Sequence, residues 1–138
     1  MKPEQILREY ELCRSQLEVY QQNLELIDGS LSGLRTVNKA LDEIKSTDKN
    51  NEMLVPLGVD SFIKARLIDP KNVIVGIGAS VAVKKTIKDA KADIENRIAE
   101  LEKVKADHTS NFEKLLSKLR ELEPSVRGIV SQAANTEG

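Results

Sequence analysis

Apolar residues near both ends of the chain recur at alternating steps of four and three, which is the heptad spacing of a coiled coil. The N-terminal row consists of Ile6, Tyr10, Cys13, Leu17, Tyr20, Leu24, Ile27, Leu31, Leu34, polar Asn38 and Leu41. The C-terminal segment has one row at Ile87, Ile94, Leu101, His108, Leu115, Leu122 and Ile129, and a second at Lys91, Ile98, Lys105, Phe112, Leu119, Val126 and Ala133. This spacing predicts two long helices, over residues 4–46 and 86–134, that pair as an antiparallel coiled coil.

Local signals set the expected ends of these helices. Pro3 suits a first turn, because its missing N–H would have no helical partner there. The polar run 46–51 ends the first helix, since its short side chains compete for backbone hydrogen bonds. The Thr86 hydroxyl is placed to cap the amide near Asp89 and so to begin the second helix. Pro124 is expected to kink or end that helix, because proline cannot donate the next hydrogen bond.

Between the helices, residues 52–85 change to the period-two pattern of β-strands. Ile63 and Ala65 alternate with Lys64, and the neighbouring segments are rich in β-branched residues. Pro56 cannot donate to a ladder, so its strand is expected at an edge or with a bulge. The region is divided into two β-hairpins by turn-forming residues at 58–61, 69–72 and 78–80.

Two small hairpins with an apolar face are marginally stable alone in water, and their open edges favour pairing with another chain. The paired helices satisfy each other and cannot also cover the strands. We therefore expect an α+β fold in which a long antiparallel coiled-coil hairpin carries two β-hairpins that form a β-barrel body on oligomerisation. The residues expected at this oligomerisation surface are Leu54, Val55, Leu57, Ile63, Leu67, Val73, Val75, Ile77, Val81 and Val83.

The composition fits a single domain over residues 1–138 whose apolar residues are spread along seams. The chain has 3% aromatic residues, no Trp and a formal net charge of −1. No basic stripe with interleaved aromatic residues appears, so a nucleic acid partner has little support. No segment approaches the roughly 20 apolar residues of a membrane span, and the first residues contain no apolar signal core. We expect a cytoplasmic protein with no membrane partner.

The sequence contains no convincing catalytic, cofactor or metal site. His108 is the only histidine and occupies a seam position, so core packing is the expected role rather than ligation or pH sensing. Cys13 is the only cysteine, which excludes an intrachain disulfide. Gly76 and Gly78 resemble half of a dinucleotide-binding motif, but no helix follows directly, and a turn is the simpler interpretation. We expect no enzyme activity and no cofactor.

Four segments of the middle region carry a family resemblance: Leu54–Gly58, Ser61–Ala65, Asp69–Val75 and Gly78–Thr86. In these segments, and in the helix–hairpins–helix order of essentially the whole chain, the sequence resembles the α type of the prefoldin family, as found in archaea. Two hairpins rather than one are typical of the α type. Ser80 is a departure, because the family often has glycine there and a positive φ is harder for serine.

The resemblance implies an ATP-independent chaperone subunit that holds unfolded or nascent polypeptides and delivers them to a cytosolic group II chaperonin. It also implies a hexamer of two α and four β prefoldin subunits, with a double β-barrel and six coiled-coil tentacles that hold clients at their distal tips. An alternative function is a structural or adaptor coiled coil that joins defined partners and has no holding activity.

A further apolar row lies beside the seam of the first helix. It consists of Leu12, Val19 and Leu26 and is called the outer stripe. One interpretation is that these side chains widen the intramolecular seam. The other is that they form, with residues near the chain ends, a face that holds apolar client segments through weak, multivalent contacts. The client-binding residues under this hypothesis are Leu7, Leu12, Val19, Leu26, Val126, Ile129 and Val130.

Overall fold

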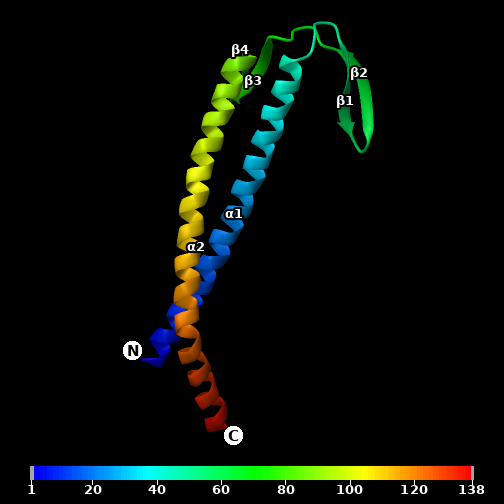
Figure 1. Cartoon of the computed structure of the whole chain (residues 1–138). Coiled ribbons are helices and arrows are strands. Elements are labelled where there is room, and N and C mark those ends of the chain that lie inside the picture. The colour runs from blue at the N-terminus through cyan, green and yellow to red at the C-terminus, as the bar shows by residue number, and fades with distance from the viewer. Residues whose placement is uncertain (1, 138) are drawn as a thin grey trace. The chain divides into compact units, whose positions relative to one another are not determined.

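The computed structural model describes residues 2–137 and contains two long helices separated by two β-hairpins (Figure 1). The elements are α1 (Pro3–Lys45), β1 (Glu52–Gly58), β2 (Ser61–Arg66), β3 (Asn72–Gly78), β4 (Val81–Thr86) and α2 (Ile87–Glu137). This order confirms the predicted α+β arrangement of helix, two hairpins and helix. The chain divides into two compact units: a terminal unit, with the residues up to Ser30 and from Leu101 onward, and a central unit, Leu31–Glu100.

In the terminal unit, α1 and α2 pair through the predicted heptad positions. All of these positions in this unit are buried or half-buried except Ala133, which is exposed. Cys13 Sγ donates a hydrogen bond to the backbone carbonyl of Leu115 over 3.8 Å, and the rings of Tyr20 and His108 meet edge to face at 5.4 Å. Cys13 precedes Tyr20 in α1, whereas its partner Leu115 follows His108 in α2. The two segments therefore run antiparallel.

In the central unit, the core joins the end of α1, the start of α2 and the β3–β4 hairpin. Leu41, Ile87 and Ala90 are buried at its centre. An ion pair between Asp42 and Lys91 also connects the two helices. The β3–β4 hairpin is therefore fixed to the helices by its apolar side chains. The partly buried residues packed against this core are Ile44, Val73, Val75 and Ile94.

The two hairpins repeat the same local structure. β1 and β3 begin at positions 52 and 72, and β2 and β4 begin at positions 61 and 81. Each pair of strands is antiparallel and forms its own two-stranded sheet. The register shifts between Pro56 and Gly58 in the first hairpin and between Gly76 and Gly78 in the second. Pro56 therefore lies in an edge strand beside an irregularity, as its missing donor predicts.

Both hairpins turn through two residues in the left-handed region. Val59 and Asp60 have φ of 48° and 57°, and Ala79 and Ser80 have φ of 50° and 60°. A type I′ turn requires positive φ at both central positions and matches the twist of the flanking strands. Ser80 therefore adopts a conformation that glycine would adopt at lower cost. Val59 is the more strained residue, because β-branched side chains rarely take positive φ.

The predicted start of the second helix is confirmed. Thr86 Oγ1 accepts a hydrogen bond from the Asp89 amide over 3.1 Å, which satisfies one of the free donors of the first turn. The first helix ends at Lys45, just before the polar run that was expected to stop it. Short polar side chains therefore set both inner helix ends.

The second helix was expected to kink or end at Pro124, and of these two alternatives the ending is excluded, because α2 continues through this residue to Glu137. Proline removes one hydrogen bond to the carbonyl four residues earlier. Pro124 is exposed, so water can hydrate that carbonyl. Val126 and Ile129 are half-buried beyond it and continue the apolar seam, which favours the helical conformation.

Candidate interaction surfaces

The first hairpin, β1–β2, exposes apolar side chains on both of its faces. Val55 and Ile63 are paired across the ladder and share one face. Phe62 follows the opposite parity and lies on the other face with Leu54. All four side chains are exposed. Neither face of this hairpin is therefore covered by its own chain.

Part of the apolar surface of the second hairpin, β3–β4, is covered within the chain, because Val73 and Val75 pack against the central core. The structure thus divides the predicted oligomerisation residues into two groups. Those exposed to solvent are Leu54, Val55, Leu57, Ile63, Ile77 and Val81. Those that are half-buried are Leu67, Val73, Val75 and Val83.

Four exposed apolar residues of this region are absent from the set predicted from the sequence. Phe62 and Ile74 lie within strands, and Ile68 lies in the connection between the hairpins. Val59, at the tip of the first turn, is 100% exposed. Phe62 and Ile74 each have an apolar neighbour in the same strand. Because consecutive strand residues face opposite ways, such a run indicates that both faces of the strand carry apolar side chains. No periodic signal marks the other two.

The outer stripe lies in the terminal unit and is open to solvent. Leu12, Val19 and Leu26 are 57%, 55% and 70% exposed, so most of their surface is not used within the chain. The other residues of the client-binding hypothesis differ among themselves. Val130 is exposed, whereas Leu7, Val126 and Ile129 are half-buried.

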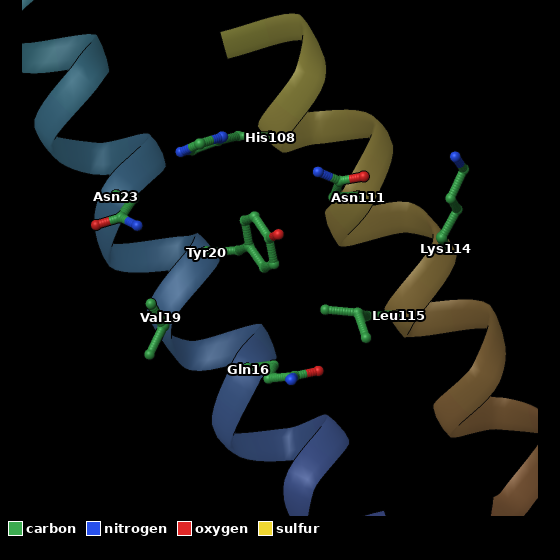
Figure 2. A pocket seen from close by; sticks show the side chains of 8 residues that line it. All are labelled: Gln16, Val19, Tyr20, Asn23, His108, Asn111, Lys114 and Leu115. Atoms are coloured by element: carbon green, nitrogen blue, oxygen red, sulfur yellow. The ribbon is translucent and has the colours of Figure 1, made fainter. Parts of the chain in front are cut away.

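A groove of about 600 Å³ lies between the helices of the terminal unit (Figure 2). His108 points toward α1 and Tyr20 points toward α2, where the two rings meet. Val19 belongs to both the groove and the outer stripe, so the two surfaces are continuous. Heptad analysis did not identify this groove, because it depends on polar side chains beside the seam. The lining residues are Gln16, Val19, Tyr20, Asn23, His108, Asn111, Lys114 and Leu115.

Asp69 holds the connection between the two hairpins. Its Oδ1 accepts hydrogen bonds from the backbone amides of Lys71 and Asn72 over 3.0 and 3.2 Å. The Lys71 amide, followed by the Asn72 side chain, favours the ionised form and lowers the pKa of Asp69 below its ordinary value of 3.8. Lys84 Nζ lies 3.7 Å from the same carboxylate. The Asp69 carboxylate therefore fixes the backbone at the start of β3 through these two hydrogen bonds.

Two further kinds of feature are absent from residues 2–137, a metal-binding cluster and a membrane-spanning helix. This range contains no group of histidine, cysteine, aspartate or glutamate side chains that could hold a metal ion. Neither helix in the same range combines the length and apolar character needed to cross a lipid bilayer. The surfaces that the exposed residues and the groove provide are apolar in the hairpins and the outer stripe, and partly lined by carboxamides in the groove.

These features define a chain of two long helices and two β-hairpins that leaves apolar side chains exposed on its strands and on its outer stripe. The sequence model of the family described as Prefoldin subunit matches residues 13–132. The chain is 36% identical over 99 residues to prefoldin subunit alpha 1 of Thermococcus kodakarensis, covering 72% of this chain and 68% of that protein. It is 29% identical over 135 residues to prefoldin subunit alpha of Pyrococcus horikoshii, covering 97% and 86%.

Among solved structures, the fold is similar to that of a chain in filamentous prefoldin from Methanocaldococcus jannaschii, with a TM-score of 0.71. That match has 19% identity and covers 85% of this chain and 97% of the other. The chain belongs to the prefoldin family, and the resemblance to archaeal α-type subunits is confirmed. Membership supports the role of a chaperone subunit in a non-enzymatic family.

Proposed function

We propose that this chain is a holding subunit of a cytoplasmic, ATP-independent chaperone, which keeps unfolded or nascent polypeptides soluble and delivers them to a group II chaperonin. The exposed outer stripe is the observation that supports this proposal. Complete burial of one such aliphatic side chain contributes about 1.5–3 kcal/mol, so partial burial of several gives weak and reversible binding. Such binding suits clients that share only exposed apolar segments.

We propose that the partners in this complex are β-type prefoldin subunits, in a hexamer of two α and four β chains. The uncovered faces of β1–β2 support this, because an isolated two-stranded sheet is marginally stable in water. In the hexamer the strands would close into β-barrels. Native mass measurement on a mixture with a β-type subunit tests the assembly. A mass of two α and four β chains is expected, and a monomer or dimer that ignores the β subunit contradicts it.

The holding function is tested with the triple variant Leu12→Ser, Val19→Ser and Leu26→Ser. We expect the hexamer and its helicity to persist, while suppression of the aggregation of a chemically unfolded protein falls several-fold. A matched pair compares Val19→Ser with Val37→Ser, because Val37 is also an exposed valine of α1, at 47%, but lies in the central unit. Only Val19→Ser should weaken protection.

Unchanged protection by the triple variant contradicts the assignment of the outer stripe. A loss of helicity or assembly in that variant would instead show that the stripe is structural. If the unaltered hexamer forms but protects no unfolded protein, the adaptor alternative is correct.

A further inference from the structure

The groove beside Val19 is lined by polar side chains, which a site for purely apolar contacts would not need. Its walls carry the carboxamides of Gln16, Asn23 and Asn111. In residues 2–137, none of these three groups is hydrogen-bonded to another part of the chain. Each therefore has free donors and a free acceptor in a groove that is also lined by the apolar side chains of Val19 and Leu115.

A carboxamide has the same donor and acceptor groups as a peptide bond, so it can pair with the main chain of any client. Gln16 and Asn23 are seven positions apart on α1, which is about 10.5 Å along the helix axis. Three residues of an extended strand span about 10 Å. An extended segment that lies along α1 therefore presents main-chain groups to both carboxamides, while its side chains can contact the apolar lining residues.

The charge of the groove adds a preference. The residues that line the groove include two basic side chains, Lys114 and His108, and no carboxylate. In residues 2–137, Lys114 forms no ion pair. A carboxylate of the bound segment would meet an unpaired ammonium group, whereas a lysine there would be repelled.

We propose that this groove binds an extended segment of unfolded polypeptide through its main chain, and that Lys114 favours segments with an acidic residue beside apolar ones. This inference rests on the proposed holding function and adds to it the conformation and charge of the ligand. Main-chain recognition gives affinity without a sequence requirement, and the single charge gives a mild selection among clients.

The main-chain part is tested with a fluorescent ten-residue peptide in which Leu and Ser alternate around two Glu, and with its analogue N-methylated at alternate residues. Titrated with the full-length chain, the methylated peptide should bind about 2- to 10-fold more weakly. In the variant Gln16→Ala with Asn23→Ala this difference should disappear. Alanine is the best helix former, so the helices persist in this variant, and circular dichroism verifies it. A methylation effect that survives in the variant overturns main-chain recognition by the groove.

The charge part is tested with the same peptide carrying Lys in place of Glu. The Glu peptide should bind about 2- to 5-fold more tightly at low salt. Lys114→Gln should abolish this preference, while Lys103→Gln, on the same helix but outside the groove, should keep it. A preference that persists in Lys114→Gln overturns the charge part. If all three peptides bind the unaltered chain equally, the whole proposal fails while holding remains, and if none binds, the holding function fails as well.

Discussion

The two hairpins have strands of the same lengths, the same register and the same turn geometry, yet their surroundings differ. In the second, Val73 and Val75 pack against the helix core, and Lys85 Nζ lies 2.5 Å from the Asp93 carboxylate of α2. In the first, Val55 and Ile63 are exposed. One local structure thus gives one hairpin that belongs to the chain's own core and one whose apolar faces stay exposed.

The connections explain this difference. β4 ends at Thr86 and α2 begins at the next residue, so the second hairpin is fixed to the helix without a loop. The Ile87 amide also donates to the Lys71 carbonyl over 3.0 Å, which ties both ends of that hairpin together. The first hairpin is closed by the Asn50 amide, which donates to the Leu67 carbonyl over 2.7 Å. Its base is closed, but residues 46–51 separate it from α1 and residues 67–71 separate it from β3.

The largest effect is expected from Ile87→Ala, because Ile87 is 3% exposed at the centre of the core that anchors the second hairpin. Removing this side chain should lower the free energy of unfolding by about 2–5 kcal/mol, measured by urea denaturation followed by circular dichroism. The matched variant Ile63→Ala, at a position 53% exposed in the first hairpin, should change the lone chain by less than about 1 kcal/mol. Equal losses would show that both hairpins are anchored alike.

The same Ile63→Ala variant should weaken the binding of β-type subunits. Covering the exposed half of an isoleucine contributes about 1 kcal/mol, so the dissociation constant for β-type subunits should rise about five-fold. Sedimentation of the mixed subunits measures it. An unchanged constant would mean that this face of the first hairpin is not a subunit interface.

Heptad spacing was sufficient to predict the helix pair, because a seam is a local pattern repeated many times. Asn38 shows the limit of that pattern: it occupies a predicted seam position and is half-buried, but its Oδ1 is buried without a hydrogen-bond partner in the part of the chain that the structure describes. Strand periodicity gave the hairpins and their turns. It could not show that Val73 and Val75 pack against the helix core, because that depends on tertiary contacts rather than on alternation.

A smaller effect is expected at the hairpin turns. Val59→Asn should stabilise the first hairpin by about 0.5–1 kcal/mol, because asparagine tolerates the left-handed conformation that valine adopts with strain. Ala79→Asn, at the equivalent position of the second hairpin, should give a smaller gain, since alanine is not β-branched. Thermal unfolding of the two variants compares them. A loss of stability in Val59→Asn would indicate that the valine side chain makes a contact that outweighs the strain.

The smallest effect concerns pH and the connection to β3. Because the pKa of Asp69 is lowered in the folded state, its stabilising contribution is present above pH 3.8 and is lost as the pH falls through the lowered pKa. The protection factors of the Lys71 and Asn72 amides against hydrogen exchange should therefore fall on acidification in this range. In Asp69→Asn the two amides should lose this pH dependence. An unchanged acid response in that variant would assign the effect to another carboxylate.

The candidate surfaces were predicted less completely than the fold. The outer stripe was readable because its three members repeat every seven residues, the same signal that gives the seam. The groove joins Gln16 and Asn23 of α1 to Asn111 and Lys114 of α2, which are far apart in the sequence. No local pattern of polar residues distinguishes such a wall from an ordinary solvated helix face, so the structure was needed to bring these residues together.

Hydrogen exchange of the β1–β2 amides, measured for the lone chain and after mixing with a β-type prefoldin subunit, tests the central claim most directly. We expect rapid exchange in the first hairpin of the lone chain and strong protection after mixing, while the second hairpin is protected in both samples. Equal protection of both hairpins in the lone chain, or no gain on mixing, would contradict the account.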